Sequence, residues 1–74
     1  MGIKVNLDEM LHQRRMTLTE LSGRVGISLT NLSILKNGRS KGIRFSTLSS
    51  ICSELDCEPG DILARDHSSL EGED

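Results

Sequence analysis

The sequence predicts an all-α fold, a compact bundle of five short helices, and three observations support this prediction. Apolar residues recur at spacings of three and four, as on one face of a helix. Residues that cap or end helices separate these segments. Phe45 is the one aromatic residue among 74, so the predicted core is small and consists of Leu, Ile, Val and Met side chains.

Ahead of the helices, residues 1–5 are expected to form a short extended arm, because apolar residues alternate there with a lysine. The first helix is predicted over residues 7–15, with Asn6 as its N-cap. Its apolar stripe consists of Leu7, Met10 and Leu11. Two acids in the first turn, and Arg14 and Arg15 in the last, have the signs that the helix dipole favours.

Two further helices are predicted to follow, joined by a tight turn. Thr17 and Glu20 have the spacing of a capping box at the start of the second helix, and Gly26 suits the left-handed residue that ends it. Ser28 is a suitable cap for a third helix over residues 29–36. This arrangement is a helix-turn-helix, whose second helix typically enters the major groove of DNA.

A polar, basic loop over residues 39–44 precedes the fourth helix, which is predicted over residues 46–55. The apolar face of this helix consists of Leu48, Ile51, Cys52 and Leu55. Pro59 suits the first position of a last helix, which ends at Leu63. The expected organisation is an N-terminal arm (1–5), a folded domain (6–64) and a flexible acidic tail (65–74).

Charge is unevenly distributed along the chain. The net charge of −2 argues by itself against nucleic acid as a partner. Residues 10–45, however, carry seven basic side chains and one acid, whereas residues 46–74 carry eight acids and one base. Affinity for phosphate follows the local potential. The asymmetry therefore favours an anionic partner at the basic part, with chance clustering on a solvated surface as the alternative.

The run T-L-T-E-L-S-G-R-V-G-I-S-L-T-N-L-S-I-L-K-N-G, residues 17–38, resembles the helix-turn-helix of phage repressors and Cro proteins. The similarity continues through residues 39–45 and through T-L-S-S-I-C-S-E-L-D-C-E-P-G-D-I-L, so that it covers roughly residues 5–64. The C-x4-C-x-P-G-D ending is similar to that of a subgroup of very small bacterial regulators.

This resemblance implies a role for each matching position. The residues that would face base edges are Ser28, Leu29, Thr30, Asn31 and Ser33. Those that would lie along the phosphates are Thr17, Lys36, Asn37, Arg39 and Lys41. Arg44 falls where some phage repressors place an arginine in the minor groove, a contact that reads groove width.

Two positions depart from the phage repressors, which carry glutamine where this chain has Leu18 and Leu29. Leucine forms no hydrogen bond with a base, although contact with a thymine methyl group remains available. Asn31, whose amide can pair with adenine, is therefore the strongest candidate reader. The two leucines, with Ile34, are also candidates for a patch that binds another protein.

Other kinds of site have little support in the sequence. Cys52 and Cys57, with His12 and His67, lack the spacing of zinc ligands, so no metal is expected. Cys52 is predicted to be buried, and a redox role for the pair stays open. No catalytic arrangement or phosphate-binding glycine loop is present, so neither enzymatic activity, a cofactor nor a small-molecule substrate is expected.

The leading hypothesis is therefore a sequence-specific regulator, a repressor, that binds double-stranded DNA. We expect a homodimer, because one half-site contact buries little surface. The resemblance to very small bacterial regulators implies a bacterial protein. We expect it in the cytosol, because no apolar run approaches the roughly 20 residues of a membrane span and no signal peptide is visible. The alternative is a protein-interaction module on the same scaffold, such as an antitoxin or an antirepressor.

Overall fold

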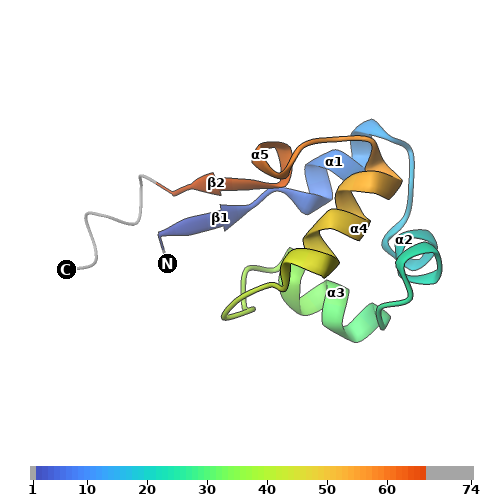
Figure 1. Cartoon of the computed structure of the whole chain (residues 1–74), viewed down its shortest axis with the longest axis horizontal. Helices are drawn as coiled ribbons and strands as arrows, with labels where there is room; N and C mark the ends of the chain where they lie inside the picture. The colour runs from blue at the N-terminus through green and yellow to red at the C-terminus, as the bar shows by residue number, and fades with distance from the viewer. Residues whose placement is uncertain (1, 67–74) are drawn as a thin grey trace.

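Five helices surround one apolar core, and a two-stranded sheet extends from one end of them (Figure 1). The computed structural model describes residues 2–66. The helices are α1 (Leu7–Gln13), α2 (Leu18–Val25), α3 (Leu29–Lys36), α4 (Phe45–Leu55) and α5 (Pro59–Ile62), and the strands are β1 (Ile3–Val5) and β2 (Leu63–Arg65). None of the helices in this range is long and apolar enough to cross a membrane.

The sheet corrects the all-α prediction. β1, the predicted extended arm, pairs antiparallel with β2, so that Val5 lies opposite Leu63 and Ile3 opposite Arg65. The sequence assigned Leu63 to the last helix and Arg65 to the acidic tail, and both assignments were wrong. The paired segments come from opposite ends of the domain, so no local pattern marks them as partners. Residues 67–74, the remainder of the predicted tail, lie outside the described residues.

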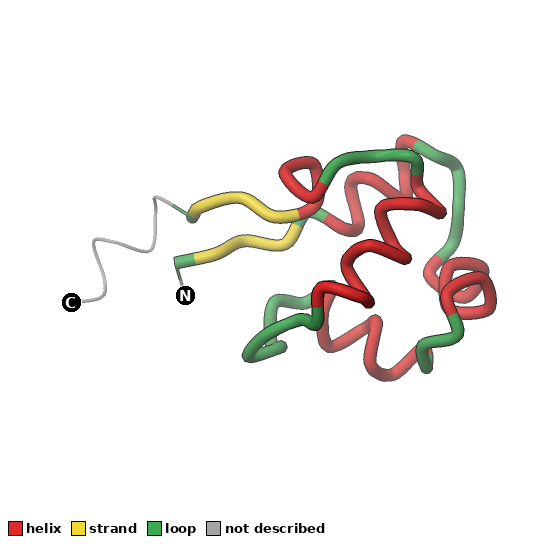
Figure 2. Tube along the Cα trace, in the orientation of Figure 1, coloured by secondary structure: helices red, strands yellow, loops and turns green. Residues whose placement is uncertain are grey.

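The core is aliphatic, as predicted. Its most deeply buried side chains are Leu7, Leu21, Leu32, Ile51, Leu55 and Ile62. These residues come from all five helices, whereas the ribbon of β1 and β2 extends to one side of them (Figure 2). Phe45 is 87% exposed and contributes nothing to the core.

The helix-turn-helix has the predicted ends. The Thr17 hydroxyl accepts a hydrogen bond from the Glu20 amide at 3.0 Å, and the Glu20 carboxylate accepts one from the Thr17 amide at 3.1 Å, which completes the capping box. Gly26 ends α2 with a φ of 72°, where a Cβ atom would be strained. The Ser28 hydroxyl caps α3 by accepting from the Asn31 amide at 3.1 Å. Local chemistry therefore accounts for where α3 begins along the chain.

The start of α1 is held by a contact that the sequence did not predict. Asn6 occupies the N-cap position, but its side chain makes no capping hydrogen bond. Its backbone amide instead donates to the carbonyl of Ile62 at 2.6 Å. This bond ties the start of α1 to the end of α5, directly beside the ribbon.

The end of α1 also differs from the prediction. The helix ends at Gln13, because Arg15 adopts a left-handed conformation with a φ of 53°. Arg14 does not complement the dipole of its own helix as expected. Its guanidinium donates to the carbonyls of Leu55 and Asp56, at 2.6 and 3.0 Å, and so satisfies the end of α4.

Candidate nucleic-acid interface

The first turn of α3 is exposed because the helix is anchored from its opposite side. The buried residues of α3 are Leu32 and Leu35. The exposed residues at its start are Ser28, Leu29, Thr30 and Asn31. Ser33, which was also predicted to face bases, is half-buried. The structure therefore leaves four of the five predicted base-facing residues accessible.

Two hollows in the surface lie on opposite sides of α3. The first, of about 440 Å³, lies between α3, the loop before α4 and the start of α4, and its lining includes Ser28, Asn31 and Arg44. The second, of about 350 Å³, is lined by Leu29, Thr30, Ser33, Ile34, Asn37 and Arg39. Each hollow thus combines polar residues of α3 with one arginine from the following loop.

The cations of this loop are not neutralised within the described chain. Arg39, Lys41 and Arg44 are exposed, and none of them forms an ion pair within residues 2–66. Lys36 is different, because it is half-buried and its Nζ lies 4.0 Å from an Asp8 carboxylate oxygen. The positive potential near α3 therefore comes mainly from the loop.

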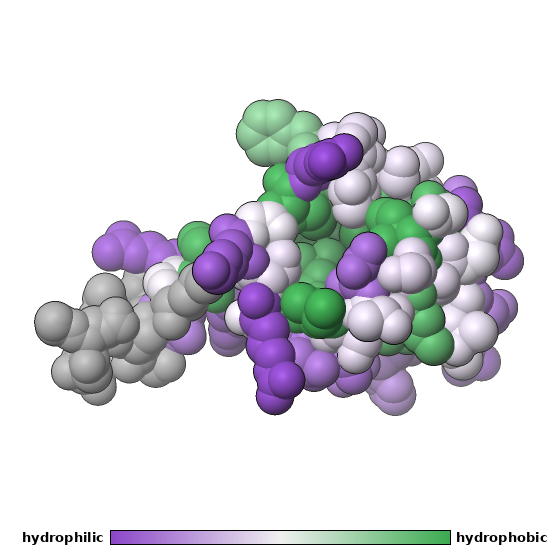
Figure 3. Space-filling model, turned by 90° about the horizontal axis from the view of Figure 1, so that it is seen from below, coloured by the Kyte–Doolittle hydropathy of each residue, from purple (hydrophilic) through white to green (hydrophobic). Residues whose placement is uncertain are grey.

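Three predicted contacts, Thr17, Lys36 and Lys41, line neither hollow. The Thr17 hydroxyl is exposed at the start of α2, where it already caps the helix. Lys41 lies beyond the hollows, toward the ribbon. Figure 3 views the molecule from the side on which α3 lies in Figure 1 and shows green apolar patches interrupted by pale and purple polar residues. The face is thus mixed in character.

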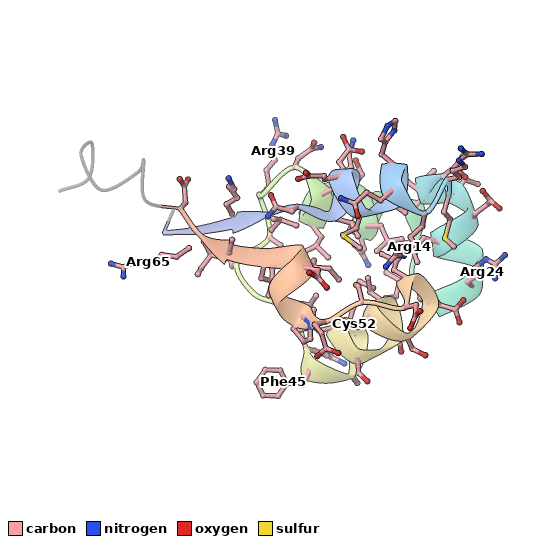
Figure 4. All side chains as sticks on the ribbon, turned by 90° about the horizontal axis from the view of Figure 1, so that it is seen from above. Arg14, Arg24, Arg39, Phe45, Cys52 and Arg65 are labelled. Atoms are coloured by element: carbon pink, nitrogen blue, oxygen red, sulfur yellow. The ribbon has the colours of Figure 1, made fainter. Side chains whose placement is uncertain are left out.

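Phe45 is a candidate contact that the sequence analysis missed. α4 begins at Phe45, one residue earlier than predicted, with Arg44 at the N-cap but without a capping hydrogen bond from its side chain. The ring extends away from the helices (Figure 4) and lies next in sequence to an arginine assigned to the minor groove. The sequence signal for such a contact was a single phenylalanine directly after a basic loop, but the helical spacing of apolar residues assigns Phe45 no role.

Within residues 2–66 the two cysteines do not join other residues in a group suited to a metal. Cys52 is buried, as predicted, and both thiols are free. Burial raises the pKa of both, that of Cys57 to about 11, so at neutral pH they are protonated and poor nucleophiles. No group of three His, Cys, Asp or Glu side chains suited to a metal occurs within residues 2–66. His67 lies outside that range.

Comparison with known proteins shows which family has this arrangement. Residues 6–67 match the Cro/C1-type HTH DNA-binding domain, HTH standing for helix-turn-helix. The chain belongs to this family. The resemblance to phage repressors and Cro proteins is thereby confirmed, and α2, the turn at Gly26 and α3 are the helix-turn-helix of a Cro/C1-type domain.

Two relatives of this Cro/C1-type domain are similar over most of its length. It is 62% identical over 63 residues to the uncharacterized HTH-type transcriptional regulator YozG of Bacillus subtilis (strain 168), an alignment that covers 85% of this chain and 75% of the relative. It is 30% identical to the transcriptional regulator VanUg, known from a crystal structure, with a TM-score of 0.70 and 89% of each chain covered.

Proposed function

We propose that this Cro/C1-type domain is a sequence-specific regulator of transcription that binds double-stranded DNA and acts as a repressor. The observation that carries the proposal is the exposed first turn of α3, with Arg44 at one side of the helix and Arg39 at the other. An α-helix with its side chains is about 10–12 Å across, which fits the roughly 12 Å width of the major groove. α3 therefore enters that groove with its first turn leading.

Asn31 is the principal base reader in this proposal. Its backbone amide donates to the Ser28 hydroxyl, but its side-chain amide has no hydrogen-bond partner within residues 2–66. The side chain is therefore available to donate to and accept from the same adenine. Leu29, which is 45% exposed, contacts a thymine methyl group, and the Thr30 hydroxyl bonds to either kind of base. Ser33 contributes least, because it is half-buried.

The DNA backbone is held by the residues around this reading turn. The proposed phosphate contacts are Thr17, Lys36, Asn37, Arg39 and Lys41. The starts of α2 and α3 add amide groups and the positive ends of two helix dipoles. Arg44 enters the minor groove and responds to its width. Lys36 contributes less than the loop cations, because Asp8 partly neutralises it.

The functional unit in this proposal is a homodimer on a two-fold operator. A single small domain buries little DNA surface, and helix-turn-helix proteins gain affinity by binding two half-sites about one helical turn apart. Repression is proposed from the likeness to phage repressors and Cro proteins, since a dimer bound across a promoter excludes other proteins from it.

Salt dependence of binding tests the proposal. Replacement of Arg39, Lys41 and Arg44 together by Ala should weaken binding to mixed-sequence DNA. It should also reduce the slope of log affinity against log salt by about 0.9 for each phosphate that the protein no longer neutralises. Lys4→Ala on β1 is the matched control, because it removes an exposed cation outside both hollows. An unchanged slope in the triple variant, with binding still present, would contradict the proposed interface.

A protein-interaction module is the second candidate, and a specific observation favours it. Leu29 and Ile34 on α3 are 45% and 40% exposed, which is high for large apolar side chains. An antitoxin or antirepressor would use this patch to contact a protein. Replacement of both residues by Ser would then abolish partner binding and leave any weak DNA binding with its salt slope unchanged.

A further inference from the structure

The ribbon and the basic loop enclose an apolar groove that the proposed base contacts do not use. It has a volume of about 400 Å³ and lies between β1 and β2 on one side and the end of α3 with the following loop on the other. Its apolar side chains include Ile3, Val5, Ile43 and Leu63, and its cations are Lys41 and Arg65. We call it the ribbon groove.

The ribbon groove is suited to an apolar occupant. Its volume falls in the range of pockets that hold ligands. Ile3, at its outer end, is 54% exposed within the described residues, although isoleucine is among the residues most often buried. An occupant should therefore supply an apolar side chain for the groove and negative charge for the two cations beside it.

We infer that the ribbon groove binds the segment of this same chain that follows β2, residues 67–74. The sequence of this segment, H-S-S-L-E-G-E-D, contains one large apolar residue and three acids. Leu70 occupies the groove, and the carboxylates of Glu71, Glu73 and Asp74 lie beside its cations. The segment thus matches the lining in both apolar character and charge.

The point at which the chain leaves the ribbon makes this docking sterically feasible. The Asp66 amide donates to the Gly2 carbonyl at 2.7 Å, so the chain leaves β2 at the outer end of the ribbon. Leu70 follows four residues later, a reach of up to about 14 Å. The three-residue strands are about 10 Å long. A turn within residues 67–69 is therefore sufficient to bring Leu70 back to the groove.

A second copy of the protein fits the ribbon groove less well. A two-fold contact places the same patch of both subunits face to face. Such a contact would bring Lys41 and Arg65 of both subunits into one interface whose groove lining holds no acid to neutralise them, and like charges repel. The acids that follow Leu70 neutralise these cations instead.

Docking of the segment has a consequence for DNA binding, and this step rests on the proposed function. Lys41 lines the groove and is also a proposed phosphate contact. Three carboxylates beside it lower the positive potential that DNA meets. The segment thus acts as an internal competitor of the DNA backbone. Docking in about 70–90% of molecules reduces the apparent affinity for DNA about three- to tenfold.

Methyl NMR spectra of the full chain test the docking without DNA. In Leu70→Ser the signals of Ile3 and Ile43 should shift, whereas that of the buried Ile51 should stay in place. Ser69→Ala, which keeps the leucine and the acids, is the control and should leave all three unchanged. If the Ile3 and Ile43 signals of Leu70→Ser have the same chemical shifts as those of the parent chain, the inference is overturned. Parent signals that move on dilution would also overturn it, because they would identify a second copy as the occupant.

Binding to mixed-sequence DNA at low salt tests the consequence. Leu70→Ser and the double variant Glu71→Gln with Glu73→Gln should bind about three- to tenfold more tightly than the parent, and the gain should shrink as salt rises. Glu9→Gln on α1, outside the groove, controls for the loss of one negative charge. If the methyl signals of the groove shift but the affinity for DNA does not rise, the segment docks in the groove but does not compete with DNA. Absence of DNA binding in every variant would instead count against the proposed function.

Discussion

Helices α2 and α3 have the same length and the same kind of start, yet their exposed sides differ. Each has eight residues and a hydroxyl cap. α2 packs against both α3 and α4, and its Arg24 reaches an α4 carboxylate, Glu54, at 3.6 Å. The side chains of Leu29, Thr30 and Asn31 at the start of α3 are exposed and form no hydrogen bond or ion pair within residues 2–66. α2 thus uses its surface to hold the fold, whereas α3 leaves its first turn available to a partner.

The largest predicted effect is a difference in stability between substitutions on the buried and the exposed side of α3. Leu32→Ala should lower the free energy of unfolding by about 2–5 kcal/mol, because it leaves a cavity in the core. That loss is comparable with the whole stability of a domain of this size. Leu29→Ala, a matched change on the exposed side, should cost about 0.5 kcal/mol or less. Urea unfolding measures both, and equal losses would show that the first turn of α3 is part of the core.

The next effect concerns binding and not stability. Asn31→Ala should weaken DNA binding by about 1–3 kcal/mol at one base position and leave the melting temperature unchanged. Affinities for a panel of operators that differ at single positions measure this, with Ser53→Ala on the exposed part of α4 as the control. An equal loss on every sequence would show that Asn31 positions the helix without reading a base.

The two caps should contribute similarly to stability but differently to binding. Thr17→Ala and Ser28→Ala should each lower the free energy of unfolding by about 1 kcal/mol. Ser28→Asp should keep that stability, because a carboxylate also caps, but it should weaken DNA binding through repulsion of the phosphates. Urea unfolding and DNA titration of each variant measure the two effects. Undiminished DNA binding by Ser28→Asp would place the start of α3 away from the duplex.

The smallest effect belongs to the ion pair of α2. Glu54→Gln removes an exposed pair with Arg24, whose side chain is 54% exposed, and should cost less than about 0.5 kcal/mol. Packing of Leu21, which is completely buried, holds α2 in place instead. Urea unfolding at low and high salt measures the cost. If Glu54→Gln lowers the free energy of unfolding by more than about 1 kcal/mol at low salt but not at high salt, charge holds α2 to α4.

Features that depend on neighbouring residues were predictable from the sequence. The capping box at Thr17, the left-handed Gly26 and the Ser28 cap were each predicted and confirmed, because each involves residues within four positions of one another. Leu32 and Leu35 are buried for the same reason, since helical spacing places them on one face. The base-facing and phosphate-facing roles came from the resemblance to phage repressors, and they stay proposals.

Features that depend on distant residues were not predictable. The all-α prediction failed at β1 and β2 because strand pairing joins segments from opposite ends of the domain. Arg14 was assigned to its own helix, although its partners are carbonyls more than 40 residues away. The sequence assigned no role to Phe45, whose exposure depends on which neighbours the fold provides.

By itself, the sequence determined the helix-turn-helix, the aliphatic core and the concentration of positive charge around α3. Tertiary structure alone decided that the segments before α1 and after α5 form a ribbon, that Arg39 and Arg44 lie on opposite sides of α3, and that an apolar groove opens beside Lys41. The physical reason is that capping and helical periodicity act over a few residues. Strand pairing and grooves depend instead on contacts between segments whose separation in sequence carries no local signal.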